Sequence, residues 1–446
     1  MNILLIEPEY RSKFPPLGLM RISSFHKERG DSVNFKRGTV PELRSINWHR
    51  IYISTLFTYE LPRTIKTVQY YSPSVEDPAN DIFVGGIGAT LLPEYISDRV
   101  SCRIIKGTLD KDGMLGLKES PVAEYIPDYN MLDSVEWSYK PEDAYFIRVS
   151  IGCIRKCKFC AVPILEPHFG YLQGVSEQLR DVREKFGERR NLVVLDNNIL
   201  ALDCFPQVVE EIRNEGFEKG AKFDGRKKRT VDFNQGIDAR LITPDIAKLL
   251  SSICVSPIRL AFDFDGMESE YRRAVTLLAN VGFTKFTTYV MFNFNDTPES
   301  FYHRLKVNLE LSQQFGIRVT GFPMRYVPIN DVDRHYISKN WTWRYLRGIQ
   351  CILNATHGMV SPNPEFFEAA FGNSPEEFKK IVTMPDRYII YRNDYGSEAE
   401  EWRNPYRKLS DAERHEFLIL LERLHKSKKR REDIATAGAK FRPLLA

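Results

Sequence analysis

The sequence predicts a mixed α/β protein with an N-terminal doubly wound domain, a partial barrel of six strand-helix repeats and a mainly helical C-terminal region. Two series of apolar strands that alternate with helix-length segments predict the first two parts. Near residue 330 the strand pattern stops and helical spacing continues. The predicted parts are residues 1–106, the linker 107–143, the barrel 144–328 and the helical region 329–446.

The first hundred residues alternate between strand-like and helix-like patterns. Apolar runs at 2–8, 50–59, 81–86 and 101–107 predict strands, and the spacing at 18–30 predicts a helix. Strands separated by helices form a parallel sheet, whose ligands bind beyond the carboxyl ends of the strands. The glycines of "VGGIGAT" fit either a tight strand-to-helix turn, which is favoured, or close approach of a ligand.

The linker and the barrel differ in pattern. Gly, Pro, Asp and Lys are frequent in the linker, where apolar periodicity is weak. The six buried strands predicted after it lie at 144–152, 191–198, 230–237, 258–266, 285–295 and 317–328. Helical segments separate these strands, and in such a barrel the functional residues are expected at the carboxyl ends of the strands.

The C-terminal region is rich in aromatic residues at helical spacing. The aromatic residues concerned are Trp341, Trp343, Tyr345, Phe366, Phe367 and Phe371. Core packing is the favoured interpretation, with a base-stacking platform as the alternative. The final stretch, "TAGAKFRPLLA", is predicted to be a loosely held tail.

Composition narrows the class of protein. The chain has 446 residues, of which 43% are hydrophobic and 27% charged, and its net charge is +4. No apolar run approaches the ~18 residues of a membrane span, and the N-terminus resembles no signal peptide, so a cytoplasmic protein without a membrane partner is expected. Two dense basic runs, 225–229 and 425–433, are predicted to be solvated surface, with a nucleic-acid footprint as the minority alternative.

Three of the seven cysteines lie within eight positions, at Cys153, Cys157 and Cys160. The others, Cys102, Cys204, Cys254 and Cys351, are far apart, which disfavours a disulfide framework and leaves the thiols available as ligands.

Two metal centres are compatible with the three clustered cysteines. Structural zinc needs four ligands, and His168 is the sole nearby candidate for the fourth. A 4Fe-4S cluster held by three thiolates leaves one iron open, which a reactive cluster requires. Basic residues in the loop, Arg155, Lys156 and Lys158, favour thiolates. The spacing therefore favours the cluster over zinc, and zinc over inert core thiols.

The order C-x3-C-x-F-C, formed by Cys153, Cys157, Phe159 and Cys160 after a predicted barrel strand, resembles the signature of the radical S-adenosylmethionine (radical SAM) superfamily. The resemblance implies a 4Fe-4S cluster on the three cysteines, with S-adenosylmethionine on the fourth iron. It also implies an electron donor such as flavodoxin or ferredoxin. Reductive cleavage would yield methionine and a 5'-deoxyadenosyl radical that abstracts hydrogen from a substrate.

The resemblance also assigns cofactor contacts. These are Phe159 beside the adenine, Asp196, Asn197 and Asn198 at the amino acid part, Gln235 and Asp238 at the ribose, and Arg259 at the carboxylate. Structural alternatives stay open, because Asp196 and Asn198 are also suited to helix caps and Arg259 to an ion pair with Asp263. No catalytic acid or base is assigned.

Over about residues 1–320, the chain resembles radical SAM enzymes that carry an N-terminal cobalamin-binding-type domain. Ser54 to Leu56 matches an S-x-L element, and "GGIGAT" matches a later glycine turn in which Gly88 stands where a histidine is frequent. The D-x-H-x-x-G element is absent, because Ser24 stands where its Asp should be, two residues before His26. Cobalamin therefore stays an option without a histidine ligand. Methylthio transfer is disfavoured, since Cys102 alone precedes Cys153.

Four functions follow from these observations. The leading one is a radical SAM enzyme that abstracts hydrogen from an unidentified substrate, with a small molecule favoured. The alternatives are a cobalamin-dependent radical SAM methyltransferase and a radical SAM enzyme that modifies nucleic acid. The fourth belongs to another class, a non-catalytic binding protein in which zinc staples the three cysteines.

Overall fold

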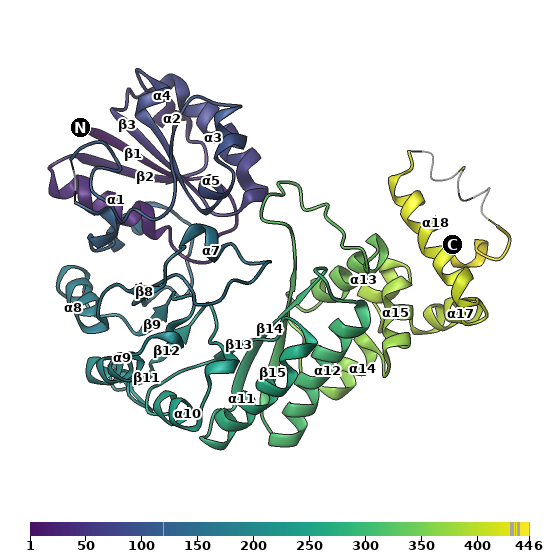
Figure 1. The fold of residues 1–446 in the computed structure, drawn as a ribbon. Helices are drawn as coiled ribbons and strands as arrows, with labels where there is room; N and C mark the ends of the chain where they lie inside the picture. Colours follow the sequence, from purple (N-terminus) through teal and green to yellow (C-terminus); the bar gives the residue numbers. More distant parts are fainter. Residues whose placement is uncertain (119, 429–431, 433, 435–437, 446) are drawn as a thin grey trace. The chain divides into compact units, whose positions relative to one another are not determined.

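The computed structural model describes residues 1–118, 120–428, 432, 434 and 438–445, and it divides into two compact units. The first unit comprises residues 1–237, 248–256 and 328–334, and the second comprises 238–247, 257–327 and the described part of 335–446. The mixed α/β class is confirmed by parallel sheets and a helical C-terminal region (Figure 1). The predicted boundaries at 106, 143 and 328 stay predictions.

The first unit begins with a five-stranded parallel sheet. Its strands are β1 (Asn2–Glu7), β2 (Ser32–Arg37), β3 (Arg50–Thr55), β4 (Ile82–Gly86) and β5 (Arg103–Ile105), in the order β2-β1-β3-β4-β5. This is an order of doubly wound sheets. Its helices are α1 (Leu17–Glu28), α2 (Pro41–Arg44), α3 (Leu61–Tyr71), α4 (Pro78–Asp81), α5 (Ile87–Leu91) and α6 (Pro93–Ser97).

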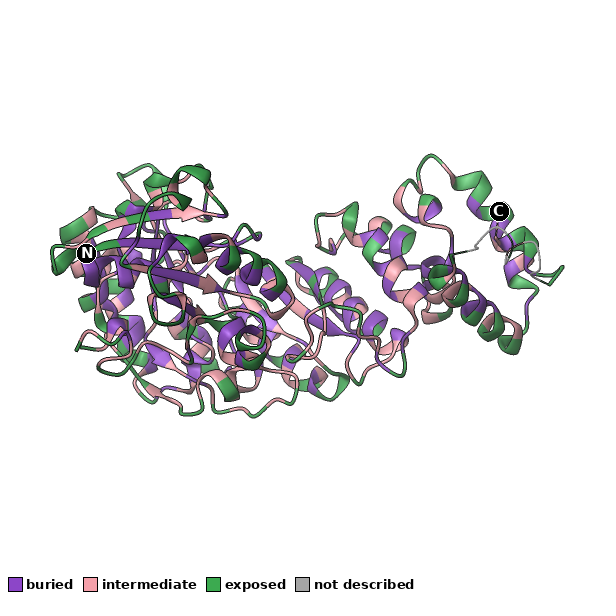
Figure 2. Cartoon of the chain, turned by 90° about the horizontal axis from the view of Figure 1, so that it is seen from above, coloured by how far each residue is buried: buried purple, intermediate pink, exposed green. Residues whose placement is uncertain are grey.

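The apolar runs of this sheet are buried on both faces. Ile3 to Ile6 are all 0% exposed, which is why β1 reads as a continuous apolar run rather than an alternating one. Figure 2 shows much of the strand ribbon beside the N-terminus in the purple of buried residues. Thr55 Oγ1 accepts from Ala89 N at 2.8 Å, and a Cβ at Gly86 would lie 2.3 Å from the Thr55 carbonyl oxygen. These contacts support the strand-to-helix turn as the reason for the glycines of "VGGIGAT".

The segment from 107 to 143 is tied to the first unit. Asp128 accepts from Ser23 Oγ at 2.6 Å and from Lys27 Nζ at 2.7 Å, and Tyr139 donates to the buried carboxylate of Glu7 at 2.5 Å. Burial raises the pKa of the Glu7 carboxyl, although Tyr139 and Arg37 stabilise its charged form. The linker is therefore packed chain, even though its sequence lacks periodicity.

All six strands predicted for the barrel are present, as two three-stranded parallel sheets. The first unit holds β6 (Ala144–Ile147), β9 (Asn191–Val194) and β12 (Thr230–Phe233), in the order β12-β9-β6. The second unit holds β13 (Ile258–Ala261), β14 (Lys285–Phe292) and β15 (Arg318–Arg325), in that order. Closure into one partial (β/α)6 barrel stays a prediction.

Helices and two short hairpins accompany these strands. The first unit has α7 (Val162–Leu165), α8 (Val175–Phe186) and α9 (Phe205–Ile212), and the second has α11 (Glu268–Asn280) and α12 (Pro298–Phe315). The antiparallel pairs are β7 (Ser150–Ile151) with β8 (Gly170–Tyr171), and β10 (Lys222–Phe223) with β11 (Lys227–Lys228). Helix α10 (Pro244–Leu250) has residues in both units.

The C-terminal helices form one apolar core with α12. They are α13 (Trp343–Asn354), α14 (Pro364–Phe371), α15 (Pro375–Thr383), α16 (Asp386–Ile390), α17 (Gly396–Arg407) and α18 (Asp411–Lys426). Trp341, Phe367 and Phe371 are buried in this core and Tyr345 and Phe366 pack against it, which confirms the core interpretation for these residues. Trp343 is half-buried and stacks on His425 instead. The tail prediction is wrong for residues 438–445, because Phe441 and Leu444 are buried in the same core. None of the described helices is long and apolar enough to cross a bilayer.

Candidate functional site

The three clustered cysteines lie in one loop that leaves the carboxyl end of β6. Strands β7 and β8 close the base of this loop by pairing Ser150 with Tyr171 and Ile151 with Gly170. Leu172 N donates to the Val149 carbonyl oxygen at 2.8 Å just outside this pair. We call residues 152–169 the cysteine loop. Its position after a parallel strand is where the sequence predicted it.

Gly152 shapes the start of the cysteine loop. Its φ is +74°, and a Cβ there would lie 2.1 Å from the His168 carbonyl oxygen. A side chain is therefore excluded both by conformation and by close approach of the returning chain. The backbone of His168, the residue considered as a fourth zinc ligand, forms the other wall of this narrow base.

Glu166 ties the cysteine loop to its surroundings. Its Oε2 accepts from Arg148 Nη2 at 2.6 Å, from Gly152 N at 2.7 Å and from Asn197 Nδ2 at 2.8 Å. Charge-assisted hydrogen bonds of this kind are stronger than neutral ones, so Glu166 fixes the loop between β6 and the residues after β9. Sequence reasoning missed this residue. The only signal was a carboxyl group in an otherwise basic loop.

Asp196 follows β9 and holds the backbone that leads into the cysteine loop. Its carboxylate accepts from Ser150 N and Ser150 Oγ at 2.5 Å each and from Val149 N at 3.0 Å. Burial raises the pKa of the Asp196 carboxyl, and the hydrogen bonds from Ser150 and Val149 act in the opposite direction. Asp196 thus positions the loop, and its contact with a cofactor stays a prediction.

Asn198, which follows β9, places its side-chain amide beside the first cysteine of the loop. Its Nδ2 lies 3.4 Å from Cys153 Sγ, which also accepts from Arg155 N at 3.3 Å. Asn198 is 3% exposed, and its Oδ1 has no hydrogen-bond partner within the described residues. A buried acceptor without a donor costs free energy, so this oxygen is suited to a donor that a ligand supplies.

The chemistry of the donor set fits a cluster with three protein ligands. Cysteine thiolates are the ligands of iron-sulfur clusters, and N–H groups that point at a ligand sulfur stabilise its negative charge. Within the described ranges, no group of three or more Cys, His, Asp or Glu side chains is arranged to hold a metal ion. The three cysteines are therefore not preassembled as a metal site in the described part of the chain, with or without His168, and metal binding by them stays a prediction.

The remaining predicted cofactor contacts are placed as follows. Phe159 is partly buried in the cysteine loop, and Gln235 is exposed just after β12. Asp238 caps the short 3-10 helix Ala239–Leu241 and pairs with Arg240 at 2.7 Å. Arg259 lies on β13, with its Nη1 3.5 Å from Tyr289 Oη. Asp238 and Arg259 belong to the second unit, and all four contacts stay predictions.

Three of the other cysteines are unsuited to ligation. Burial raises the pKa of the thiols of Cys102, Cys254 and Cys351 to about 11 in each case. At neutral pH these thiols are protonated, and a protonated thiol is neither a strong nucleophile nor a metal ligand. They serve as matched controls for substitutions in the cysteine loop.

His26, on helix α1, is a core residue of the N-terminal part of the chain. His26 is 0% exposed, with its Nδ1 2.7 Å from Asp31 Oδ2 and its Nε2 3.0 Å from Tyr52 Oη. Burial lowers the pKa of its imidazole, although Asp31 stabilises the charged form. Gly88 is packed so closely that a Cβ would lie 3.3 Å from the Phe57 carbonyl oxygen. Cobalamin binding by this domain stays a prediction.

The basic run at 225–229 forms the tip and second strand of the β10–β11 hairpin. Arg226, Lys227 and Lys228 are exposed, whereas Arg229 is buried, pairs with Glu188 and stacks on Phe217. In the second run, 429–431 and 433 lie outside the described residues. Nucleic-acid binding by either run stays a prediction.

Asp263, the second residue after β13, is predicted to make stability depend on pH. Burial raises the pKa of its carboxyl from 3.8 to about 6, against the charges of Arg304 and Arg240. The folded state then holds this proton more tightly than the unfolded state, so stability falls as pH rises from about 4 to 6. Relative to Asp263→Asn, the free energy of unfolding of the wild type should fall by up to about 2 kcal/mol between about pH 4 and pH 6. Solvent screening keeps this value below the full effect of the pKa shift, because Asp263 is partly exposed.

Urea unfolding at pH 4.5 and pH 7.5 measures this difference, with the exposed Glu401→Gln as the control. Equal pH dependence in the wild type and Asp263→Asn would contradict the raised pKa.

Comparison with known proteins gives little beyond this geometry. No protein-family model matches the chain, and no curated protein matches it. Among solved structures, the chain is similar to SuiB from Streptococcus suis bound to S-adenosylmethionine, with a TM-score of 0.32 and 13% identity. The match covers 48% of this chain and 44% of the SuiB chain, so it spans less than half of either. A likeness of this size carries no functional argument.

Proposed function

We propose that the chain is a radical SAM enzyme in which Cys153, Cys157 and Cys160 hold a 4Fe-4S cluster. The observation that carries the proposal is the cysteine loop itself, with three thiols at C-x3-C-x-F-C spacing after β6 and the buried Asn198 at the first of them. When bound, the cluster would pass one electron to S-adenosylmethionine, which breaks into methionine and a 5'-deoxyadenosyl radical that takes a hydrogen atom from the substrate.

The chain's own residues orient and shield this chemistry. The backbone N–H of Arg155 and Asn198 Nδ2 donate to Cys153 Sγ and favour the thiolate that ligation requires. Asn198 Oδ1 is a free acceptor for the ammonium group of S-adenosylmethionine. Glu166 and Asp196 hold the cysteine loop and the end of β9 together.

The test is anaerobic purification and reconstitution, followed by iron, sulfide, zinc and cobalt analysis and an assay for dithionite-driven formation of 5'-deoxyadenosine. Wild type is expected to bind about four irons and to cleave S-adenosylmethionine. Cys157→Ala should lose both properties, while Cys102→Ala, which removes a protonated thiol elsewhere in the first unit, should keep both.

Each other outcome has a meaning. Zinc without iron and no cleavage would establish the zinc-stapled class instead. Iron with cleavage and bound cobalt would favour the methyltransferase, whereas iron and cleavage without cobalt would leave hydrogen abstraction from an unidentified substrate, with flavodoxin or ferredoxin as the expected electron donor. Iron loading in Cys157→Ala equal to that of the wild type would refute the assignment of this ligand.

A further inference from the structure

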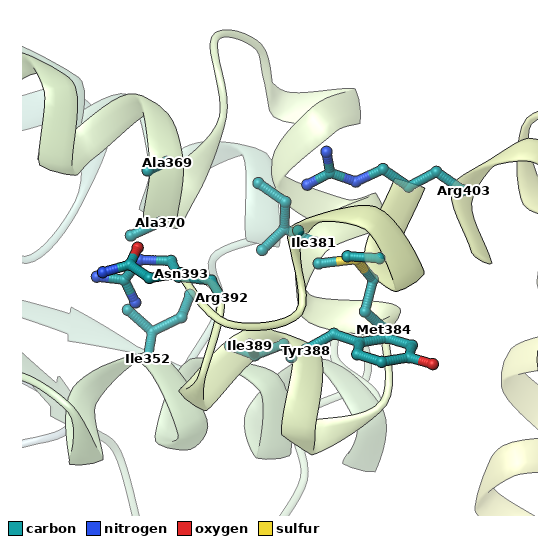
Figure 3. A pocket seen from close by; sticks show the side chains of 12 residues that line it. Ile352, Ala369, Ala370, Ile381, Met384, Tyr388, Ile389, Arg392, Asn393 and Arg403 are labelled. Atoms are coloured by element: carbon teal, nitrogen blue, oxygen red, sulfur yellow. The ribbon is translucent and has the colours of Figure 1, made fainter. Parts of the chain in front are cut away.

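The C-terminal helices of the second unit and the segment after α16 line a half-open pocket of about 220 Å³ (Figure 3). Polar and apolar atoms contribute about equally to its wall, and Ile352, Ala370, Ile381 and Ile389 are among the apolar lining residues. Liquid water occupies roughly 30 Å³ per molecule, so the pocket has room for a ligand of several non-hydrogen atoms rather than for one trapped water. Concave apolar walls with a few polar groups are typical of small-molecule sites.

Arg392, in the segment after α16, lines the pocket without an ionic partner. The guanidinium is partly buried and stacks over the Phe366 ring at 5.3 Å, and none of the described carboxylates pairs with it. Burial alone lowers the pKa of Arg392, because the described structure places no opposite charge close by. A partly desolvated cation of this kind attracts an anion more strongly than one in bulk water.

A second guanidinium reaches the pocket from α17. Arg403 Nη1 contacts Glu400 at 3.3 Å, but Glu400 also accepts from Arg407 at 2.5 Å, so one exposed carboxylate serves two arginines. Arg403 Nε is buried and makes no hydrogen bond in the described part of the chain. In Figure 3 the Arg403 side chain lies across the pocket from Arg392, with Ile381 between them.

A nearby lysine adds to the positive charge. Burial lowers the pKa of Lys380, and the charges of Arg407 and Arg403 lower it further. Of the residues that line the pocket, Arg392 and Arg403 are cationic and none is acidic. If this pocket were only a void left by imperfect helix packing, arginines would not be expected in its wall, because each buried polar group without a partner costs free energy.

We propose that this pocket binds a small organic anion, whose carboxylate or phosphate pairs with Arg392, whose charge Arg403 also attracts from across the pocket, and whose compact apolar part packs on Ile352, Ala370, Ile381 and Ile389. Arginine suits both head groups because its planar fork donates two parallel hydrogen bonds. The site lies entirely within the C-terminal helices, and the inference does not depend on the proposed cluster.

Isothermal titration of the full chain tests the proposal with three probes of similar size. The anions 4-phenylbutyrate and 3-phenylpropyl phosphate carry the two head groups, and 4-phenyl-1-butanol is their neutral counterpart. At least one anion should bind at least about tenfold more tightly than the alcohol, since a hydrogen bond to a charged group contributes at least that factor. The tighter anion identifies the head group.

Substitutions in and near the pocket test whether the probes bind there. Arg392→Gln removes the positive charge but keeps a polar side chain, and it should weaken the preferred anion at least about tenfold while leaving the alcohol within about twofold. The control Lys408→Gln removes one exposed charge at the end of α17 and should change neither. Ala369→Phe, which keeps every charge but fills the lining, should weaken all three probes.

The proposal is overturned if neither anion binds in the millimolar range, if the alcohol binds as tightly as both anions, or if Arg392→Gln binds like the wild type. It is also overturned if Ala369→Phe leaves the affinity unchanged, because the probes would then bind elsewhere.

Discussion

Replacing Arg304 with methionine is expected to lower the local stability of the β13–β14 edge by about 3–5 kcal/mol, the range for removing one partner of a buried ion pair. Arg304, on α12, is 0% exposed. Its Nη1 donates to the carbonyl oxygens of Asp263 and Met291 at 2.8 and 2.7 Å, and its Nη2 donates to Asp296 Oδ2 at 2.7 Å. Methionine preserves volume but leaves these acceptors unpaired.

Hydrogen exchange of peptides from β13 and β14 measures this loss. Arg318→Met, an exposed position at the start of β15, is the control and should change protection by less than about 0.5 kcal/mol. Arg304→Lys keeps the charge but offers a single donor group, so an intermediate loss is expected. Protection of the Arg304→Met peptides within about 1 kcal/mol of the wild type would show that this buried network is dispensable.

Replacing Gly152 with alanine is expected to open the base of the cysteine loop. The new Cβ would meet the His168 carbonyl oxygen at 2.1 Å, and the φ of +74° is itself unfavourable for alanine by about 1–2 kcal/mol. The β7–β8 pair must separate to relieve the contact. Hydrogen exchange across 149–172 should then rise, with the β1–β5 sheet unaffected.

Gly170→Ala is a closely matched control, since Gly170 lies in the same β7–β8 pair and a Cβ there meets no atom within 4 Å. It should leave exchange unchanged. Under the proposed function, Gly152→Ala should also lose iron after reconstitution, whereas Gly170→Ala should retain it. Wild-type exchange in Gly152→Ala would show that the loop accommodates the methyl group and that Gly152 is not required.

The buried strands were predictable because a strand that is buried is apolar over a short stretch of sequence. β1, β9 and β14 consist largely of apolar or β-branched residues and were identified without tertiary information. β2 was missed because it lies at the sheet edge, where only Phe35 among its residues is buried and polar residues dominate.

Of the candidate site, the sequence allowed only the candidate ligands and the polar residues at the strand end to be predicted. The spacing of the three cysteines is a local property, and so is the position of Asp196 and Asn198 at a strand end. Glu166, Arg148 and Ser150 were not singled out, because their roles arise from contacts between segments that are far apart in the chain, such as Asp196 with Ser150. The pocket beside Arg392 left no sequence signal for the same reason.

By itself, the sequence determined the mixed α/β class, the six later strands, the aromatic core and a loop with three thiols, since each depends on short-range pattern. Only the tertiary structure decided that His26 is a core residue, that Phe441 and Leu444 are packed rather than loose, and that Asn198 reaches Cys153. The physical reason is that burial and hydrogen bonding depend on which segments meet in space. Those neighbours decide whether a side chain of a given type is already hydrogen-bonded or is available to a ligand.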